Sequence, residues 1–284
     1  CKIAHEKGIL VAVDNTFMSP YFQRPIELGA DFVIHSTTKY INGHSDVIGG
    51  VVISKNKEHG EKLHYIQMSV GAVPGPFDCW LTQRSIKTLH LRMPRHNENG
   101  IKVAKFLQKS DKIKNIYYPG LTSHPQHELA KQQQLDPNGD PGFGAMISID
   151  LETLDRAAMF CKNLKIFTLA ESLGGVESLI CHPATMTHAS VDDETKNLLG
   201  IDDALVRLSI GCEETNDLIS DILFALNKFW KLRDLLKNPI WKNLELGYSI
   251  PDSIHAVSVA LPTWNDVINY EEKNQECMNL LKSI

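Results

Sequence analysis

The sequence predicts an α/β protein, with a parallel sheet first and a smaller α+β unit after it. Short apolar runs that end at a polar residue are typical of central strands in a parallel sheet. Three such runs occur early in the chain, at Gly8–Asp14, Asp31–His35 and Gly49–Ser54. Helix-like segments between strands favour α/β layering. A later succession of strand, helix, strand, strand and helix patterns indicates the α+β unit.

The later elements are predicted in chain order from their apolar spacing. The stretch from Asp78 to Gln108 has a helical pattern, although Pro94 is expected to break or kink it. Gly144–Asp150 is a strand candidate, and Thr153 is suited to cap the helix that follows. Two more strands, a last helix and a loop are expected at Ile166–Leu169, Ala204–Ile210, Leu218–Leu226 and Gln132–Gly142.

Composition narrows the class of protein. The 284 residues are 43% hydrophobic and 22% charged, as in an ordinary globular protein. A net charge of −5 gives no reason to expect nucleic acid or an anionic membrane as a partner. The six cysteines include no C-x-x-C pair, which favours a reducing compartment, the cytoplasm. No apolar run approaches the length of a membrane span, and no signal peptide opens the chain.

One lysine lies in surroundings suited to an anionic ligand. Lys39 stands in H-S-T-T-K-Y-I-N-G-H-S-D, directly after an apolar run and beside the hydroxyls of Ser36 and Thr38, which could bind a phosphate. Asp14 ends the preceding strand and could emerge at the same edge of the sheet. A Schiff-base lysine and an aspartate are the partners that pyridoxal phosphate requires. The alternative is an exposed lysine, with Asp14 capping a turn.

Several motifs resemble those of the Cys/Met metabolism enzymes, which use pyridoxal phosphate. The longest is V-D-N-T-F-M-S-P-Y-F-Q-R-P-I-E-L-G-A-D-F-V-I-H-S-T-T-K-Y-I-N-G-H-S-D. Others are V-G-A-V-P-G-P-F-D-C-W-L, R-S-I-K-T-L-H-L-R-M, Y-Y-P-G-L-T-S-H-P-Q-H-E-L-A, L-A-E-S-L-G-G-V-E-S-L, M-T-H-A-S-V and V-R-L-S-I-G-C-E. Together they span residues 1 to about 227, and within the family they are most similar to cystathionine γ-lyases and γ-synthases.

The resemblance implies roles for seven residues. Lys39 would form the Schiff base with the cofactor and later move protons, and Asp14 would partner the pyridine nitrogen. Ser36 and Thr38 would bind the cofactor phosphate. The remaining residues would face the substrate: Arg207 at its α-carboxylate, Ser172 as a further polar contact near the lysine, and Glu171 at the distal ammonium group of cystathionine. Without the resemblance, Arg207 would be half of a surface ion pair and Glu171 a solvated side chain.

The resemblance also implies a fold and a domain division. The expected fold is the fold type I of pyridoxal phosphate enzymes, aspartate aminotransferase-like, with a partial large domain at residues 1–95 and a small domain at 96–228. Because the chain opens on Cys1, we expect the family's glycine-bearing phosphate loop and ring-stacking tyrosine to lie before it. Residues 229–284 form a divergent tail that resembles the N-terminal stretch of fungal-type γ-synthases. Two interpretations stay open for this tail: the start of a fused second unit, or an artefact of gene prediction.

The reaction implied is γ-elimination on cystathionine, giving cysteine, 2-oxobutanoate and ammonia in trans-sulfuration. A γ-synthase, which joins cysteine to an activated homoserine, is the first alternative, because both activities share their early chemistry. An inactive fragment or regulatory subunit that binds a partner and no cofactor is the second. The resemblance implies a homotetramer that acts on a small amino-acid substrate.

Other candidate residues are interpreted as structural. His124 and His127 have no nearby third ligand, so no metal site is expected. The remaining candidates are interpreted as structural histidines or core cysteines: His182, His188, Cys79, Cys161 and Cys181.

Overall fold

The computed structural model describes residues 1–236, with side chains as far as residue 228. By its internal contacts the chain divides into two units, Cys1–Leu226 and Asn227–Ile284, and the first is described below. Of the divergent tail expected at residues 229–284, all but the backbone of residues 229–236 lies outside the described residues. Among residues 1–236, no helix has the length and apolar character needed to cross a membrane.

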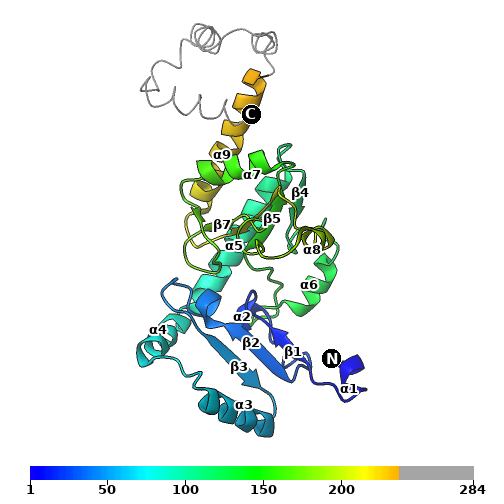
Figure 1. Cartoon of the computed structure of the whole chain (residues 1–284), viewed down its shortest axis with the longest axis vertical. Helices are drawn as coiled ribbons and strands as arrows, with labels where there is room; N and C mark the ends of the chain where they lie inside the picture. Colours follow the sequence, from blue (N-terminus) through cyan, green and yellow to red (C-terminus); the bar gives the residue numbers. More distant parts are fainter. Residues whose placement is uncertain (237–284) are drawn as a thin grey trace. The chain divides into compact units, whose positions relative to one another are not determined.

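The first sheet is built from the three early apolar runs and has the order β1-β2-β3 (Figure 1). Its strands and the surrounding elements are α1 (Lys2–His5), β1 (Ala12–Asp14), α2 (Ser19–Phe22), β2 (Phe32–Ser36), the π-helical turn η1 (Thr37–Ile41), β3 (Gly50–Ser54), α3 (Lys57–Val70), α4 (Pro76–Ile86) and α5 (Leu89–Gln108). The strand predicted from Gly8 begins only at Ala12.

The third strand departs from the prediction of a parallel sheet. β1 and β2 are parallel, but β3 runs antiparallel to β2. The reason lies in the connection: the Thr37 N–H donates to the Gly49 carbonyl at 2.9 Å, which closes a loop where a parallel pair would need a crossover. β3 is also not covered on both faces, as a central parallel strand would be. Its residues Val52 and Ile53 keep 47% and 43% of their surface exposed.

The second sheet has five strands in the order β4-β5-β8-β7-β6. All its neighbours are antiparallel except β6 and β7, which are parallel. The elements of this part are β4 (Asn115–Tyr117), α6 (His127–Gln133), β5 (Met146–Asp150), α7 (Leu154–Asn163), β6 (Thr168–Leu169), β7 (Leu179–Cys181), α8 (Asp193–Leu198), β8 (Leu205–Ser209) and α9 (Thr215–Leu236). The sequence pattern did not indicate β4, β7, α3, α6 or α8.

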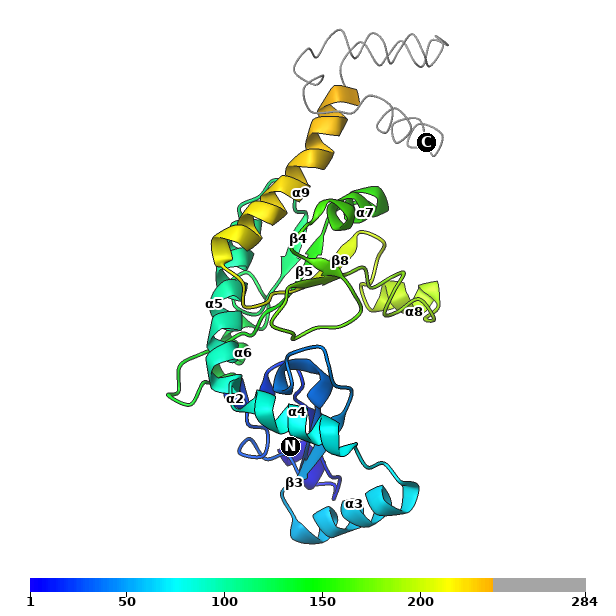
Figure 2. The same cartoon turned by 90° about the vertical axis from the view of Figure 1, so that its left-hand side faces the viewer.

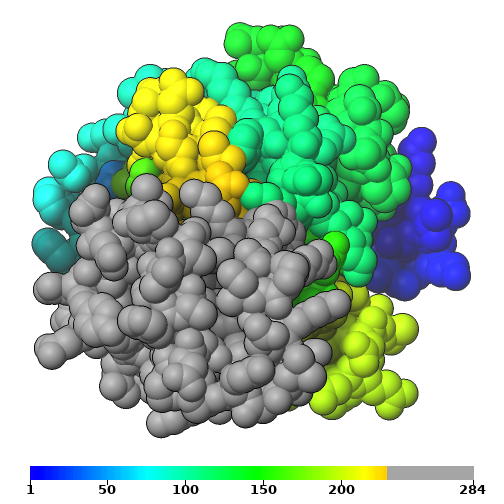
Figure 3. Space-filling model, turned by 90° about the horizontal axis from the view of Figure 1, so that it is seen from above, coloured from blue at the N-terminus to red at the C-terminus, as the bar shows by residue number. Residues whose placement is uncertain are grey.

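The main core lies between this sheet and the helices α5, α7 and α9 (Figure 2). Seen from above, the first turns of α9 lie beside α5 (Figure 3), as their shared core residues require. Strands β5 and β8 and the three helices contribute fully buried side chains, among them Ile147, Leu208, Leu107, Ala157 and Ile222. This burial fixes β8, which matters for the site because β8 carries Arg207.

Two local predictions have different outcomes. Thr153 caps α7 as predicted, its hydroxyl accepting the Arg156 N–H at 3.3 Å. The helix break was wrongly placed: the helical stretch is interrupted at Lys87 and Thr88, and α5 runs on through Pro94. Because Pro94 lies on the exposed side of the helix, water can bond the carbonyl that the missing N–H leaves free.

Asp221 provides a first test of the packing. This buried carboxylate on α9 accepts the N–H groups of Lys165 at 2.9 Å, Ile166 at 2.8 Å and Phe167 at 3.5 Å. We expect Asp221→Ala to lower the free energy of unfolding by about 3 kcal/mol, because several N–H groups lose a charged acceptor. Asp221→Asn should cost less, since its amide oxygen still accepts. Urea unfolding followed by circular dichroism measures both, and equal stability of all three proteins would contradict the assignment.

Candidate active site

The turn η1 positions Lys39 at the end of β2. The Gly43 N–H donates to the Lys39 carbonyl at 2.7 Å, and the Asn42 N–H donates to the Thr37 carbonyl at 3.0 Å. Between these bonds Lys39 leaves the helical path, with φ −91° and ψ −132°. Its Nζ lies 3.2 Å from the hydroxyl oxygen of Ser172, which belongs to the second half of the chain. The half-buried amine is thus held between the two sheets.

The two hydroxyl residues before Lys39 differ in availability. The hydroxyl of Ser36 makes no hydrogen bond to another described side chain or backbone group, while its N–H donates to the Thr16 hydroxyl at 2.9 Å. The Thr38 hydroxyl already interacts with Gly49, accepting its N–H at 3.0 Å and facing its carbonyl at 3.3 Å. The Ser36 hydroxyl could therefore donate to an anion at this position directly. The Thr38 hydroxyl would first have to rotate away from Gly49.

Asp14 lies at the same edge of the sheet as Ser36. Parallel pairing places Asp14 opposite Ile34, so both strands end on one side. One carboxylate oxygen of Asp14 accepts the Thr16 N–H at 2.9 Å, as in the turn-capping alternative. The side chain nevertheless remains exposed, and its second oxygen is available. Thr16 links the two ends, because it bonds both Asp14 and Ser36.

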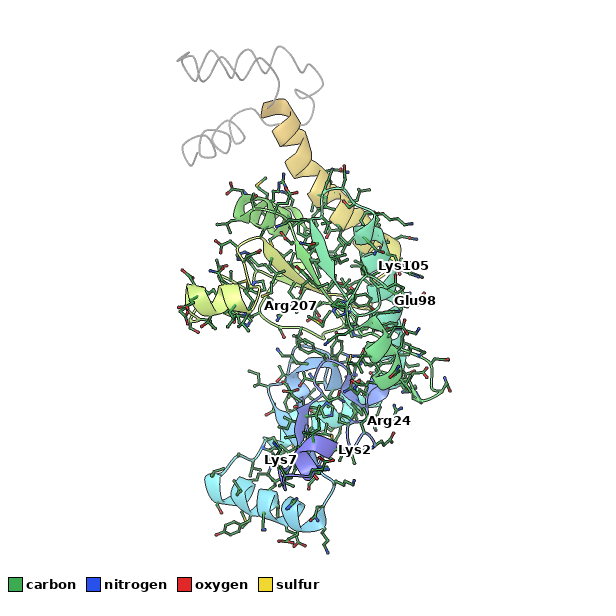
Figure 4. All side chains as sticks on the ribbon, turned by 90° about the vertical axis from the view of Figure 1, so that its right-hand side faces the viewer. Lys2, Lys7, Arg24, Glu98, Lys105 and Arg207 are labelled. Carbon is green, nitrogen blue, oxygen red and sulfur yellow. The ribbon has the colours of Figure 1, made fainter. Side chains whose placement is uncertain are left out.

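The second half of the chain contributes Arg207, Ser172 and Glu171. Arg207 lies on β8 between Ser148 of β5 and Cys181 of β7. Figure 4 shows its side chain on the side of the five-stranded sheet that lies toward the first sheet. Its guanidinium donates to the Glu171 carbonyl at 3.4 Å, whereas the Glu171 carboxylate is exposed. Of these three residues, Ser172 bonds the amine of Lys39, and Arg207 is near enough for its charge to act on that amine.

Burial and a neighbouring charge act on the amine of Lys39. Partial burial lowers the pKa of Lys39, and the positive charge of Arg207 lowers it further. A lower pKa increases the fraction of neutral amine, which is the nucleophilic form. Burial also lowers the pKa of the neighbouring His35, which Asp14 partly offsets.

The other candidates are engaged in structural contacts. His127 bonds the Pro119 carbonyl at 2.7 Å, and His182 bonds both the Thr185 hydroxyl and the Asp203 carbonyl. No group of His, Cys, Asp and Glu side chains within the described part of the chain could hold a metal ion. Cys181 is buried as predicted, and Cys161 is half-buried and packs against the main core, whereas Cys79 is half-buried outside that core.

These residues fit pyridoxal phosphate. A desolvated lysine amine, an exposed carboxylate and a free hydroxyl lie along one edge of an α/β sheet, and they match the aldehyde, the pyridine nitrogen and the phosphate of that cofactor. The fold and the site thus define the class of protein: the fold type I of pyridoxal phosphate enzymes.

Comparison with known proteins specifies the family. The sequence model of the family of Cys/Met metabolism PLP-dependent enzymes matches residues 1–227, and the chain belongs to this family. It is 52% identical over 225 residues to cystathionine γ-lyase of Dictyostelium discoideum, covering 79% of this chain and 57% of the relative. It is also 52% identical over 226 residues to cystathionine β-lyase of Lactococcus lactis subsp. cremoris, covering 80% of this chain and 58% of the relative.

Among solved structures, cystathionine γ-synthase of Xanthomonas oryzae pv. oryzae, in complex with aminoacrylate and cysteine, matches with a TM-score of 0.76 and 47% identity. The match covers 80% of this chain and 57% of that one. The chain thus spans somewhat more than half the length of the relatives it matches. The relatives include γ-lyases, β-lyases and γ-synthases, so the comparisons fix the chemistry of the family and leave the individual reaction open.

Two residues near the site were not predicted. Thr16 joins the ends of β1 and β2, and Arg92 bonds the turn that carries Lys39. Arg92 stands in R-S-I-K-T-L-H-L-R-M, a motif that contributed to the family resemblance without suggesting a role. The sequence did offer one signal for Arg92, since it lies on the apolar face of a helical pattern. A buried charge in that position needs hydrogen-bond partners.

Proposed function

We propose that this chain catalyses γ-elimination on cystathionine, in which cystathionine and water give cysteine, 2-oxobutanoate and ammonia. One observation carries the proposal. Lys39 follows β2 of the first sheet and Ser172 follows β6 of the second, yet their side chains meet at 3.2 Å, and Arg207 is close enough for its charge to lower the pKa of Lys39. An amine tuned in this way beside a carboxylate-binding cation suits chemistry on an amino acid.

Four residues would hold the cofactor. Lys39 would bond its aldehyde carbon, Asp14 would keep the pyridine nitrogen protonated, and Ser36 and Thr38 would donate to the phosphate. Bound there, pyridoxal phosphate supplies an electron sink for the carbanion formed at the substrate Cα. Thr16 would keep the Asp14 and Ser36 ends in register through the two bonds described above.

The other residues would orient the substrate and move its protons. The guanidinium of Arg207 can donate two parallel hydrogen bonds to an α-carboxylate, which fixes the Cα–H bond relative to Lys39. The amine of Lys39, once free, would take the proton from Cα. Ser172 would hold that amine in place through their hydrogen bond. The exposed carboxylate of Glu171 would attract the distal ammonium group of cystathionine.

A γ-synthase is the second candidate function, because a solved γ-synthase is 47% identical to this chain. Both reactions need the same lysine and arginine, and they differ in whether cysteine leaves the substrate or adds to it. β-Cleavage, as the names of some relatives indicate, would release pyruvate from cystathionine. An inactive or regulatory chain would bind no cofactor at all.

The experiment has two stages. The chain is first incubated with pyridoxal phosphate and borohydride, and peptide mass spectrometry locates the reduced adduct, which we expect on Lys39. Release of 2-oxobutanoate and of pyruvate from cystathionine is then compared with formation of cystathionine from an activated homoserine and cysteine. Faster synthesis would favour the γ-synthase, excess pyruvate the β-lyase, and an absence of adduct the regulatory chain.

We also propose that the protein is a cytoplasmic homo-oligomer, a tetramer as in the family resemblance. Apolar side chains on α3 and α4 support assembly, since large ones remain exposed, among them Tyr65, Met68, Val70, Phe77 and Trp80. The cysteines of the described part are all free, which suits a reducing compartment. Analytical ultracentrifugation would test the assembly.

A further inference from the structure

Arg92 is a buried cation that the proposed function does not use. It lies on α5 with 6% of its surface exposed. Its guanidinium makes four hydrogen bonds: to the Tyr40 carbonyl at 2.7 Å, the Ile41 carbonyl at 3.1 Å, the Ser85 carbonyl at 3.1 Å and the Thr88 hydroxyl at 3.0 Å. None of the ion pairs within the described residues gives it a carboxylate partner. Such a desolvated charge is costly unless its contacts are all in place.

Two of these acceptors belong to the turn that carries Lys39. Within η1 and its cap, the Thr37 and Lys39 carbonyls accept backbone N–H groups, so the next two carbonyls, of Tyr40 and Ile41, are left for Arg92. Carbonyls at the C-terminal end of a helical turn carry partial negative charge, which a cation stabilises. The Ser85 carbonyl lies likewise near the C-terminal end of α4. Arg92 therefore holds the ends of two helical segments together.

The same helix also reaches the strand that carries Arg207. One turn beyond Arg92, His96 bonds the Ile210 carbonyl at 2.8 Å, and Asn99 donates to the Gly211 carbonyl at 3.0 Å. Both acceptors directly follow β8. α5 thus contacts the turn that carries Lys39 near its first turn and the end of the Arg207 strand near its middle.

We infer that Arg92 is a positioning residue for Lys39: its guanidinium fixes the backbone after Lys39, and thereby the depth and direction of the amine between the two sheets. The fork geometry is needed, because the four acceptors lie on three separate segments. A lysine in its place keeps the charge but bonds fewer of them. The close approach is also visible at Gly43, where an added Cβ would lie 2.2 Å from the Arg92 guanidinium.

The effect of Arg92 on catalysis rests on the proposed function, but its effect on the Lys39 amine does not. The main measurement, the pKa of Lys39, therefore needs no cofactor. The cofactor-free chain is acylated with a trace of acetic anhydride at a series of pH values, and mass spectrometry of the Lys39 peptide gives the pKa of its amine. In Arg92→Lys and Arg92→Met we expect this pKa to rise toward the ordinary lysine value, because a looser turn lets water reach the amine. In the chain loaded with pyridoxal phosphate, kcat should fall about ten-fold, with a smaller change in KM.

The matched control is Arg95→Met on the same helix. Arg95 bonds the carbonyls of Cys212 and Glu213 and none of the carbonyls of the Lys39 turn, so its loss should leave the pKa of Lys39 unchanged. If Arg92→Met does not fold, Thr88→Val removes a single acceptor of the guanidinium and should shift the pKa of Lys39 in the same direction by less. A folded Arg92→Lys or Thr88→Val chain whose Lys39 titrates as in the parent overturns the inference. Failure of the proposed function, in contrast, would show as absent cofactor binding with the acylation result intact.

Discussion

Replacing Lys39 by alanine is expected to lower the rate of cystathionine cleavage by roughly three orders of magnitude, because in the proposed function one group would both anchor the cofactor and move the proton. The borohydride-reducible adduct should disappear from the peptide that contains position 39. Lys39→Arg should be equally inactive, since a guanidinium keeps the charge and cannot form the covalent bond. Steady-state kinetics on cystathionine and peptide mapping measure the two effects.

A second lysine at a strand end is the matched control. Lys55 follows β3 and is exposed, so Lys55→Ala should change neither the adduct nor the rate. Exposed amines also react with pyridoxal phosphate, but their pKa keeps them protonated at neutral pH, and they bind it weakly. An adduct spread evenly over several lysines, or undiminished in Lys39→Ala, would remove the basis of the proposed function.

The sequence predicted the features that depend on neighbours along the chain. The apolar runs before Asp14 and His35 produce β1 and β2, and their parallel pairing follows from the separation between them. Thr153 caps α7 because the cap needs only residues within one turn. The polar edge where Asp14 and Ser36 end could be derived in the same way, because both strand ends are local signals.

Features that depend on distant partners could not be derived from the residues alone. The direction of β3 is set by the closure of its loop at Gly49, and β7 is a three-residue strand held by its pairing with β8 and β6. The partner of Lys39, Ser172, was placed near it by the family resemblance and by no local pattern. Arg92 was overlooked because it lies on α5, whereas the carbonyls that it bonds, those of Tyr40 and Ile41, belong to the distant turn η1. In each case the controlling contact is made in three dimensions and leaves no periodicity in the sequence.

Replacing Arg207 by methionine is expected to lower kcat/KM for cystathionine about 100-fold, mainly through KM, because under the proposed function the substrate carboxylate would lose a charge-assisted pair of hydrogen bonds. It should also change Lys39. The charge of Arg207 is one of the two causes that lower the pKa of Lys39, so its removal raises that pKa. The neutral amine then appears at higher pH, and the acylation curve of Lys39 in the cofactor-free chain should move to higher pH in Arg207→Met.

Arg207→Lys separates the two effects. A lysine retains the positive charge near Lys39, so the acylation curve should stay close to that of the parent. It lacks the planar fork, so KM should still rise. If both variants left the Lys39 curve unchanged, the two side chains would not interact, and the grouping of Lys39 and Arg207 at one site would be wrong. If KM were unchanged in both, Arg207 would lie outside the substrate site, and its bond to the Glu171 carbonyl would be structural. The pair of variants therefore tests two contacts of Arg207 independently: its electrostatic effect on Lys39 and its proposed bond to the substrate.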